Sequence, residues 1–328
     1  MRYKVAAFSY RQDEIAYFEK FCKDYDIDLV SNKCPLTLET AHLAQGCKAV
    51  SIITTATDAV LLQKLADIGV EYISTRTIGY DHIDIESAKK LHLHIGHVNY
   101  SPYSVADYTV MLLLMTMRKI GHIIERAKGQ DFSLKNIQSP ELHNLTVGVI
   151  GTGRIGSTVI QELSGFGCPI LAYDTAPNAT AAKYASYVAL DELFAKADII
   201  TLHAPALDST YHMINAQSIN KMKDGVMIIN TARGSLINSA DLIDAIESGK
   251  VGAAGLDVVE NETDLFYFDH KYKPLSNREM AVLKSFPNVT VLPHTAFYTN
   301  QAVSDMVENS LKSCRLYFEG AENPFTIV

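Results

Sequence analysis

Three polar side chains in the second half of the sequence each follow a short apolar run of the kind that forms a buried strand. They are Arg233, Glu262 and His294. In an open α/β sheet, ligands bind at the carboxyl ends of the strands. We therefore expect these three residues to meet at one edge of a sheet and to form a single site.

The chemistry of these residues suits the reduction of a ketone next to a carboxylate. Histidine titrates near neutral pH, so His294 is the natural donor of a proton to the developing alkoxide. A carboxylate such as Glu262 on the other ring nitrogen would fix the tautomer and favour the imidazolium. The planar guanidinium of Arg233 matches a substrate carboxylate. Singly, each residue could belong to an ion pair or a core, but the set of three favours a catalytic site.

A glycine-rich turn indicates a dinucleotide site. Gly151-Thr-Gly153-Arg-Ile-Gly156 follows an apolar strand pattern and precedes a helix predicted over Ser157–Phe166. Gly151 would permit the tight turn, Gly153 the approach of a pyrophosphate, and Gly156 the close packing of helix on strand. The helix N-terminus offers N–H groups to the phosphates. Because strand, glycines and helix occur in order, a dinucleotide site is favoured over a turn that binds nothing.

The residue at the end of the next predicted strand identifies the dinucleotide. Asp174 follows the strand pattern Ile170–Tyr173. A carboxylate at this place accepts hydrogen bonds from the adenosine ribose hydroxyls. It also repels a 2′-phosphate, and residues 175–178 supply no cation that would offset the repulsion. The sequence therefore predicts NAD as the cofactor, with NADH preferred over NADPH.

The elements that must position these residues alternate between β-rich apolar runs and helical patterns, which is typical of parallel βαβ units. The predicted fold class is α/β, with two Rossmann-like, doubly wound parallel-sheet domains separated by a cleft. The predicted strands of the first alternation are Lys4–Ser9, Asp28–Ser31, Ala49–Thr54, Glu71–Thr75 and Leu93–Val98. Those of the second are Thr146–Ile150, Ile170–Tyr173, Ile199–His203, Val226–Asn230, Ala253–Val259 and Val289–Leu292. Helices outside the glycine turn are predicted over Asp13–Tyr25, Asp58–Ile68, Asp84–Leu91, Val105–Lys119 and Gln301–Phe318.

A helix start is predicted between the two alternations. Ser101 is a hydroxyl cap, and Pro102 can occupy the first helical position without losing a hydrogen bond. The helix that follows, Val105–Lys119, is apolar on most sides, so we expect it in a core or a subunit interface. The C-terminal helix, Gln301–Phe318, is expected to cross back to the first domain.

The composition argues against several classes of protein. The net charge is −8 and the Lys and Arg residues are scattered, which argues against a nucleic-acid surface. The longest apolar run, Val110–Met117, is shorter than the roughly 20 residues that a membrane span needs. The five cysteines share no short metal-ligand spacing and indicate reduced thiols of a cytoplasmic protein. No metal, membrane or nucleic-acid partner is expected.

A few other polar residues receive structural interpretations. His92, His94 and His97 fall in one predicted strand and are expected to share a face, which could imitate a metal site. No carboxylate or cysteine is placed to complete such a site, so a solvated or packed strand face is favoured. Asp84 is expected to cap the following helix. Arg76 is expected to be either an ion-pair residue or a pocket residue.

The motifs together resemble the D-isomer-specific 2-hydroxyacid dehydrogenase family over nearly the whole chain. Those that carry the resemblance are Gly151–Gly156, His203–Pro205, Met222–Gly234, Leu256–Glu262 and Pro293–Tyr298. Within the family the chain is most similar to the D-lactate dehydrogenase branch, which includes the vancomycin-resistance enzymes; the stretches are Tyr72–Gly79, Tyr100–Tyr108 and His294–Thr299. Those resistance enzymes tend to lack the strand-end acid and to use NADPH, so Asp174 is a departure that points back to NADH.

The resemblance implies roles for particular residues. Arg233 would bind the substrate carboxylate and carbonyl, His294 would donate and accept the proton, and Glu262 would be its partner. The expected substrate-binding residues are Ile78, Gly79, Tyr100 and Phe297, the first two through backbone N–H groups. The expected cofactor-binding residues are Gly151, Gly153, Arg154, Ile155, Gly156, Asp174, His203, Pro205, Thr231, Ala232 and Asp257. The same Asp257 could instead help to set His294.

The resemblance also implies an organisation and a reaction. A substrate domain of residues 1–99 plus 298–328, flavodoxin-like, would accompany an NAD-binding Rossmann domain of residues 100–297. Homodimers through the NAD domain would give the helix Val105–Lys119 a partner. The expected reaction is NADH-dependent reduction of a small 2-oxo acid, pyruvate first, to the D-2-hydroxy acid, and the reverse.

Two alternatives stay open. A wider pocket bounded by Tyr100, Phe297 and Tyr298 would suit a D-2-hydroxyisocaproate or aryl-lactate dehydrogenase. A non-catalytic NAD(H)-sensing protein on the same fold is the second alternative. Formate oxidation fits less well, because formate-oxidising relatives usually have Gln before the histidine and this chain has Pro293.

Overall fold

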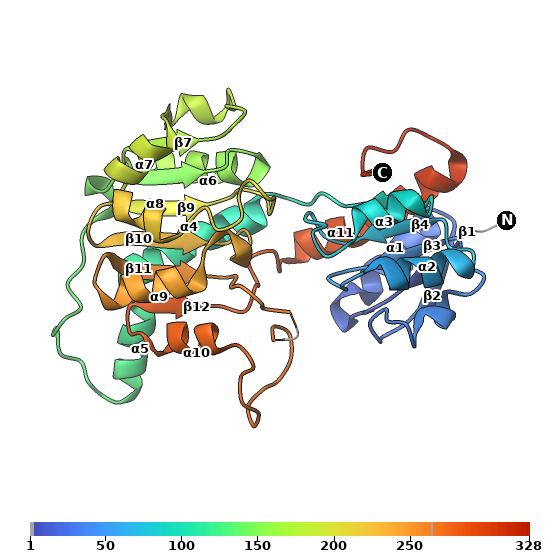
Figure 1. Cartoon of the computed structure of the whole chain (residues 1–328), viewed down its shortest axis with the longest axis horizontal. Helices are drawn as coiled ribbons and strands as arrows, with labels where there is room; N and C mark the ends of the chain where they lie inside the picture. The colour runs from blue at the N-terminus through green and yellow to red at the C-terminus, as the bar shows by residue number, and fades with distance from the viewer. Residues whose placement is uncertain (1–2, 264) are drawn as a thin grey trace. The chain divides into compact units, whose positions relative to one another are not determined.

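The computed structural model describes residues 3–263 and 265–328, which form two compact units (Figure 1). Unit 1 consists of Met1–Ser101 together with Tyr298–Val328, and unit 2 is the continuous segment Pro102–Phe297. Each unit is an α/β structure around a parallel sheet, so the predicted α/β class with two parallel-sheet domains is confirmed.

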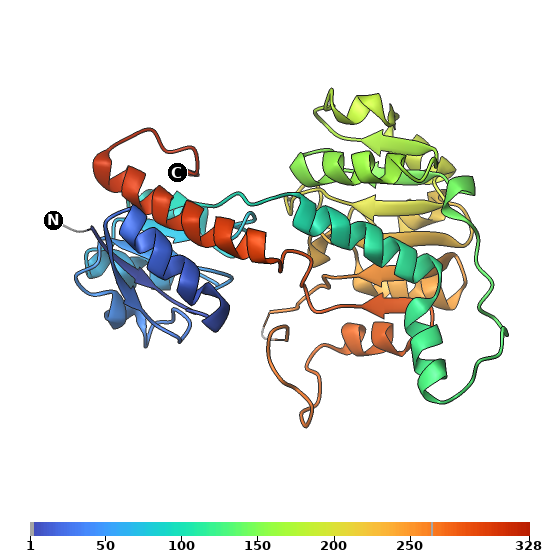
Figure 2. The same cartoon turned by 180° about the vertical axis from the view of Figure 1, so that it is seen from behind.

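Unit 1 contains a five-stranded parallel sheet in the order β2-β1-β3-β4-β5, which is the flavodoxin-like order. Its strands are β1 (Tyr3–Ala7), β2 (Ile27–Ser31), β3 (Ala49–Ile52), β4 (Tyr72–Thr75) and β5 (His94–Gly96). Its helices are α1 (Ile15–Asp24), α2 (Ala59–Asp67), α3 (Ile85–Lys90) and α11 (Asn300–Glu319). The C-terminal α11 packs against α1 and β4, and Figure 2 shows it in red beside the blue α1. Both ends of the chain therefore build this unit.

Unit 2 contains a seven-stranded parallel sheet in the order β12-β11-β10-β9-β6-β7-β8. Its strands are β6 (Val147–Ile150), β7 (Ile170–Tyr173), β8 (Ser186–Tyr187), β9 (Ile199–Leu202), β10 (Val226–Asn230), β11 (Val251–Leu256) and β12 (Val289–Val291). Its helices are α4 (Tyr103–Met117), α5 (Ile120–Lys128), α6 (Arg154–Ser164), α7 (Leu190–Lys196), α8 (Ala216–Lys221), α9 (Ser239–Glu247) and α10 (Arg278–Ser285). The strand order reverses between β6 and β9, and such a reversal is where doubly wound sheets bind nucleotides.

Each sheet has a core on both faces, which is why its strands are nearly continuous apolar runs. In unit 1, Ala6 packs with residues of α2 and α3, whereas its neighbour Val5 packs with Phe18 of α1 and Leu311 of α11. In unit 2, one core cluster joins the sheet to α4 and α6, and the other joins it to α7, α8, α9 and α10. The sheets are therefore rigid supports for the loops at their ends.

The helix α4 differs from its prediction at both ends. It begins at Tyr103 with Pro102 as its cap residue, and Ser101 instead donates its backbone N–H to Asp305 Oδ2 at 2.9 Å. It ends at Met117, because Lys119 has a positive φ of 55° and α5 starts in a new direction. The buried side of α4 packs on α6, β10 and β11. The helix therefore belongs to the core of unit 2.

The three histidines near β5 do not share one strand face, so that prediction is wrong. His92 lies in the turn before β5 with a positive φ of 55°. His94 packs against the ring of Tyr317, with centroids 5.3 Å apart, whereas His97 lies beyond the strand and donates from Nδ1 to the carbonyl of Ile78 at 3.1 Å. Of the three, His94 alone belongs to β5, so the rings do not line one strand face.

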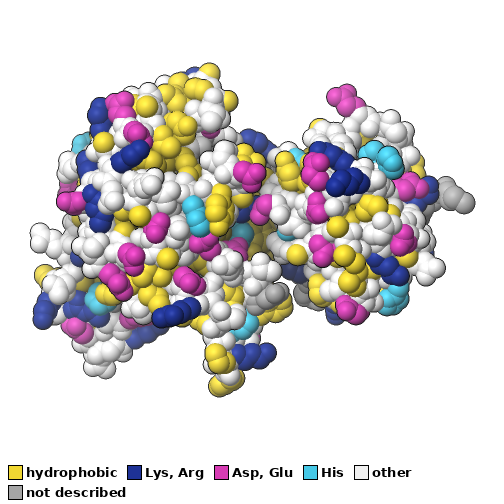
Figure 3. All heavy atoms as spheres, viewed as in Figure 1, with side chains coloured by type: hydrophobic (Ala, Val, Ile, Leu, Met, Phe, Trp, Pro, Cys, Tyr) yellow, Lys and Arg dark blue, Asp and Glu magenta, His cyan; other side chains and the backbone are white. Residues whose placement is uncertain are grey.

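The cap of α3, the hydropathy of the helices and the surface charge were also predicted from the sequence. Asp84 accepts the N–H of Ser87 and caps α3, as predicted. No described helix combines the length and the apolar content that spanning a membrane requires. On the face drawn in Figure 3, basic and acidic side chains are interspersed over both units.

Candidate active site

The glycine turn after β6 is shaped to admit a pyrophosphate. Gly151 has a positive φ of 89°, and a Cβ there would lie 2.6 Å from the carbonyl of His203. A Cβ on Gly156 would collide with the carbonyl oxygen of Gly151, so this glycine lets α6 pack close to the turn. At Gly153 a Cβ would meet nothing within 4 Å, so the turn is open in front of α6. The cradle and the helix N-terminus that NAD phosphates need are therefore both present.

The N-terminus of α6 has donors available for those phosphates. The first bond inside the helix runs from the N–H of Ser157 to the carbonyl of Gly153 at 3.0 Å. The N–H groups of Arg154 and Ile155 precede this bond and point out of the helix end. Both N–H groups are therefore available to a ligand at this end of α6.

Asp174 follows β7 and is held by the glycine turn itself. Its Oδ2 accepts the N–H of Thr152 at 2.5 Å, and its Oδ1 accepts the N–H of Ala176 at 2.9 Å. Burial opposes ionisation, but the hydrogen bonds from Ala176 and Thr152 outweigh it and lower the pKa of the carboxyl. The hydroxyl of Thr152 also donates to Oδ2, at 3.1 Å, so at least three of the roughly four acceptor sites of the carboxylate are occupied by the turn and its neighbours.

The other expected cofactor residues lie at the ends of β9 and β10. Burial lowers the pKa of His203 to about 3, so its ring is neutral, and its Nε2 bonds the hydroxyl of Thr201 at 3.0 Å. Pro205 is exposed and Ala232 is half-buried. Thr231 is buried, and its hydroxyl bonds that of Thr109 on α4 at 2.7 Å. The hydroxyl of Thr231 therefore ties β10 to α4.

His294 and Glu262 are in direct contact. The ring nitrogen Nδ1 of His294 donates to Oε1 of Glu262 at 2.5 Å, and the second carboxylate oxygen accepts the N–H of Val259 at 2.9 Å. Both side chains are about one quarter exposed, at 23% and 24%. Nδ1 faces Glu262 and carries the proton. Nε2 lies across the ring from this contact and has no partner among residues 3–263 and 265–328. This ring can exchange a proton at Nε2 while Nδ1 stays fixed.

Asp257 holds the turn that carries His294. Its carboxylate is fully buried and accepts the N–H groups of Thr295 and Ala296 at 3.0 and 2.9 Å. Its carbonyl accepts the N–H of His294 at 2.7 Å. Burial raises the pKa of Asp257, and the two N–H bonds oppose that rise. These contacts favour the second of its two expected roles, the setting of His294.

Arg233 follows β10, and β10, β11 and β12 are neighbours in the sheet. Its guanidinium donates to the carbonyl of Ala232 at 2.8 Å. A Cβ on the next residue, Gly234, would collide with the carbonyl of Val259, so the Arg233 turn rests on the loop that leads to Glu262. The three catalytic candidates therefore leave three adjacent strands at the same edge.

The expected substrate loop of unit 1 follows β4. The hydroxyl of Thr77 donates to the carbonyl of Gly79 at 2.7 Å, and His97 donates to that of Ile78. Both carbonyls are therefore engaged. The N–H groups of Ile78 and Gly79, by contrast, have no acceptor within the described chain. Tyr100 is half-buried.

Arg76, which precedes this loop, is an ion-pair residue. Arg76 and Glu14 are both fully buried and lie 3.0 Å apart, from Nε to Oε1. The guanidinium also donates to the carbonyls of Ser51 and Phe8 at 3.1 and 3.0 Å. Every donor group of this side chain faces the core, so it supports the loop from beneath.

Two aromatic residues near His294 escaped the sequence analysis. Tyr267 donates its hydroxyl to the carbonyl of His294 at 2.8 Å, and the hydroxyl of Tyr108 lies 2.9 Å from that of Thr295. The run Leu265-Phe-Tyr-Phe268, close after Glu262, was the only signal for Tyr267. Phe297, which was expected at the site, sets its ring edge-on to His294 with centroids 6.4 Å apart.

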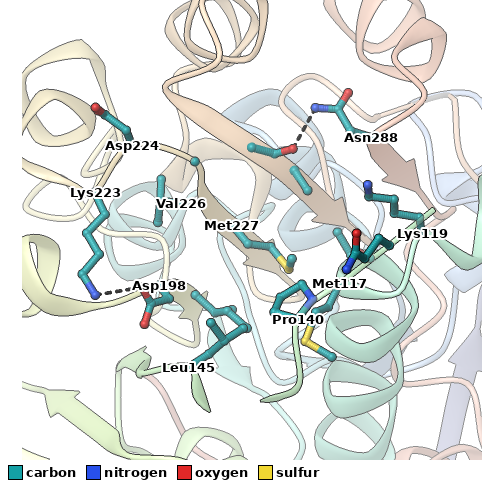
Figure 4. A pocket seen from close by; sticks show the side chains of 16 residues that line it. Met117, Lys119, Pro140, Leu145, Asp198, Lys223, Asp224, Val226, Met227 and Asn288 are labelled. Atoms are coloured by element: carbon teal, nitrogen blue, oxygen red, sulfur yellow. Dashed lines mark hydrogen bonds and ion pairs between the residues drawn. The ribbon is translucent and has the colours of Figure 1, made fainter. Parts of the chain in front are cut away.

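A separate pocket of about 280 Å³ lies at the other edge of the unit 2 sheet. It is lined by residues at the amino ends of β9, β10 and β11, together with Met117 at the end of α4 and Lys119 beyond it (Figure 4). Its rim includes the ion pair between Lys223 and Asp198, at 2.8 Å. Because parallel strands place all their carboxyl ends together, this pocket is remote from His294.

Comparisons with known proteins match this geometry. Residues 110–296 match the family model described as "D-isomer specific 2-hydroxyacid dehydrogenase, NAD binding domain". The chain is 44% identical to an aromatic 2-oxoacid reductase of Clostridium sporogenes, over 94% of each chain, and 41% identical to a D-lactate dehydrogenase of Lactiplantibacillus plantarum, over 96% of each. A solved NAD-complexed D-isomer-specific 2-hydroxyacid dehydrogenase of Lactobacillus delbrueckii is 34% identical, with a TM-score of 0.83 over 99% of this chain and 100% of that one.

Proposed function

Because the chain belongs to the D-isomer-specific 2-hydroxyacid dehydrogenase family, we propose that it reduces pyruvate to D-lactate with NADH and catalyses the reverse reaction. The observation that carries this proposal is the contact between His294 and Glu262, which leaves Nε2 of the imidazole available for a substrate. That contact lies at the same sheet edge as Arg233 and the glycine turn.

In this proposal NADH, when bound, supplies a hydride to the carbonyl carbon of the substrate. His294 in its protonated form donates the Nε2 proton to the carbonyl oxygen, and Glu262 stabilises the imidazolium through Nδ1. Arg233 binds the carboxylate and polarises the carbonyl. Ile78 and Gly79 give backbone N–H groups to the same carboxylate. In the reverse direction neutral His294 accepts the hydroxyl proton.

The chain would hold the cofactor through the glycine turn and the end of β7. The N–H groups at the start of α6, from Gly153 to Ile155, would bind the pyrophosphate. Asp174 would accept the ribose hydroxyls, and its lowered pKa keeps it charged at neutral pH. That charge would repel the 2′-phosphate of NADPH, so NADH is the preferred cofactor.

The second candidate substrate class is the aromatic 2-oxo acids. It is favoured by the 44% identity with the aromatic 2-oxoacid reductase and by the ring of Phe297 beside His294. An aromatic substrate would stack against an aromatic ring at a gain of about 1 kcal/mol. The ratio of kcat/KM for phenylpyruvate to that for pyruvate separates the two candidates.

The experiment that tests the proposal is a screen of NADH consumption by the purified protein with short, branched and aromatic 2-oxo acids, followed by chiral analysis of the product. We expect oxidation of NADH with at least one of these acids and a D-2-hydroxy acid as the only product. Formation of the L-isomer would contradict the proposal. A protein that binds NADH but oxidises it with none of the acids would instead be an NAD(H)-sensing protein.

We further propose a cytoplasmic homodimer that associates through unit 2. The five cysteines are all unpaired, which suits a reducing compartment. One chain has a mass of 36.2 kDa, so a dimer has twice that mass. Sedimentation equilibrium distinguishes the two states, and a mass of one chain at micromolar concentration would contradict the dimer.

A further inference from the structure

His212 and Glu260 form a second histidine–glutamate pair, and Glu260 lies two residues before Glu262 of the first pair. Nε2 of His212 donates to Oε1 of Glu260 at 2.6 Å, and the other carboxylate oxygen accepts the N–H of Ser239 at 2.9 Å. Both side chains are mostly buried, with 23% and 19% of their surfaces exposed. The arrangement repeats that of Glu262, which also binds one imidazole and one backbone N–H.

The pair connects loops that follow three neighbouring strands. His212 belongs to the loop after β9, and its N–H donates to the carbonyl of Ser235 at 2.9 Å, two residues after Arg233. Ser239 begins α9, which follows the Arg233 turn after β10. Glu260 lies in the loop after β11. A single imidazole–carboxylate contact thus joins the chain segments that carry the cofactor, substrate and Glu262 candidates.

The backbone of Glu260 also supports the catalytic candidates. A Cβ on Gly234 would lie only 2.6 Å from the nitrogen of Glu260, so this peptide forms the floor of the Arg233 turn. The carbonyl of Glu260 accepts the side-chain amide of Asn277 at 2.7 Å, which fixes the peptide from the other side. Movement of Glu260 would therefore displace Arg233 and Glu262 together.

We propose that His212 and Glu260 are positioning residues for the reaction, which hold the Arg233 turn and the Glu262 loop in register. This inference rests on the proposed function. The pair reaches the segment after Arg233 through two backbone N–H groups, that of His212 to the carbonyl of Ser235 and that of Ser239 to Glu260, so its effect passes through the backbone. A displacement near 1 Å in a catalytic group costs a large part of the rate.

The test compares E260A with a matched control, D241A. Asp241 accepts the N–H of Ala216 at 2.8 Å, so its side chain joins the start of α8 to α9, and among the described residues it makes no side-chain contact with the Arg233 turn. For E260A we expect kcat/KM for the 2-oxo acid to fall about tenfold, through a lower kcat and a higher KM, with the Kd for NADH nearly unchanged. For D241A we expect kcat/KM within about twofold of the wild type, although its Tm falls to a similar extent.

Two variants of His212 test whether its bond to Glu260 is what matters for activity. H212Q places an amide N–H near the position of Nε2 and keeps the bond to Glu260, so we expect it to retain most of the activity. H212A should lose as much as E260A, and the double variant H212A/E260A should lose no more than either. Equal losses in H212Q and H212A would overturn the proposal, and so would kcat/KM of E260A within about twofold of the wild type.

A second readout does not depend on turnover. In protein labelled with ¹⁵N-histidine, the ring signals of His294, assigned by comparison with H294Q, report its tautomer and its bond to Glu262. We expect these signals to change in E260A and to stay in place in D241A. If the wild type reduces no 2-oxo acid, the proposed function fails, and unchanged His294 signals in E260A would then overturn the positioning proposal separately.

Discussion

Three hydrogen bonds fix His294, and none of those described involves Nε2 of its ring. Glu262 binds Nδ1, Tyr267 binds the carbonyl, and the carbonyl of Asp257 accepts the N–H. The residue has a positive φ of 53°, a conformation that costs a non-glycine residue about 1 kcal/mol. Buried Asp257 stabilises that conformation because it accepts the next two N–H groups along the turn. The ring is therefore oriented before any substrate arrives.

At the same scale, Asp174 is expected to decide which dinucleotide binds. In D174A the ribose hydroxyls lose their acceptor and the 2′-phosphate loses its repulsion, each worth about 1 kcal/mol. We expect the ratio of kcat/KM for NADH to that for NADPH to fall at least about tenfold. D191A, which removes an exposed carboxylate that pairs with Lys221, serves as the control and should leave this ratio unchanged. An unchanged ratio in D174A would contradict the role of the charge.

At the scale of elements, the parallel strands were predictable because each is a short apolar run buried on both faces. The two-residue β8 was missed, since Ser186 and Tyr187 are partly exposed and too short to form a pattern. The start of α4 differs from the prediction, since Pro102 and not Ser101 is its cap residue. The backbone N–H of Ser101 binds Asp305, a residue 204 positions away. Local sequence signals do not contain such a partner.

Some residues of the candidate site could likewise be predicted from the sequence, and others could not. The glycine turn and the residues at strand ends have local signatures, so the sequence was enough to single them out. The pair of His212 and Glu260 spans 48 positions, and the carbonyls that accept from Arg76 belong to β3 and to the residue after β1. These contacts depend on which loops the sheet brings together, and the spacing of residues along the chain does not predict them.

The packing of α4 on α6 leads to a pH prediction. Burial, and then the nearby charge of Asp107 on α4, raise the pKa of Glu162 on α6 to about 7. The folded protein thus keeps this proton at a pH where the unfolded chain has lost it. Stability should therefore fall as the pH rises from about 4.5 to 7 and stay lower above that range.

The variant E162Q removes this titration. After a discount for solvent screening we expect a gain of about 1 kcal/mol at pH 8, or roughly 2–4 °C in Tm for a unit of this size, and little change at pH 4.5. Thermal unfolding followed by circular dichroism at both pH values measures the difference. E192Q, which changes an exposed carboxylate of α7, is the control. The same change in Tm at both pH values would count against the shifted pKa.

At the scale of the whole molecule, unit 2 is continuous in sequence and unit 1 is not. Unit 2 has core clusters on both faces of its own sheet. Unit 1 needs both chain ends, because Leu311 and Cys314 of α11 pack with Val5 and Phe18. The dinucleotide turn and the pair of His294 and Glu262 all lie in unit 2, whereas Ile78, Gly79 and Tyr100 lie in unit 1.

We therefore expect a fragment of residues 102–297 to fold alone and to bind NADH, because it keeps the whole glycine turn and Asp174. It should not reduce 2-oxo acids, because it lacks the proposed carboxylate-binding loop. Fluorescence titration with NADH and an assay of NADH oxidation measure the two properties. Full activity in the fragment would contradict the roles of Ile78 and Gly79, and loss of NADH binding in a folded fragment would contradict the assignment of the cofactor site.

The most direct test of proton transfer by His294 is the turnover of H294Q at saturating NADH and 2-oxo acid. Glutamine keeps much of the shape of the ring but cannot donate a proton as an acid. We expect kcat to fall by about a hundredfold or more, with the Kd for NADH within about threefold of that of the wild type. A variant that turns over at nearly the wild-type rate would show that the proton comes from another group.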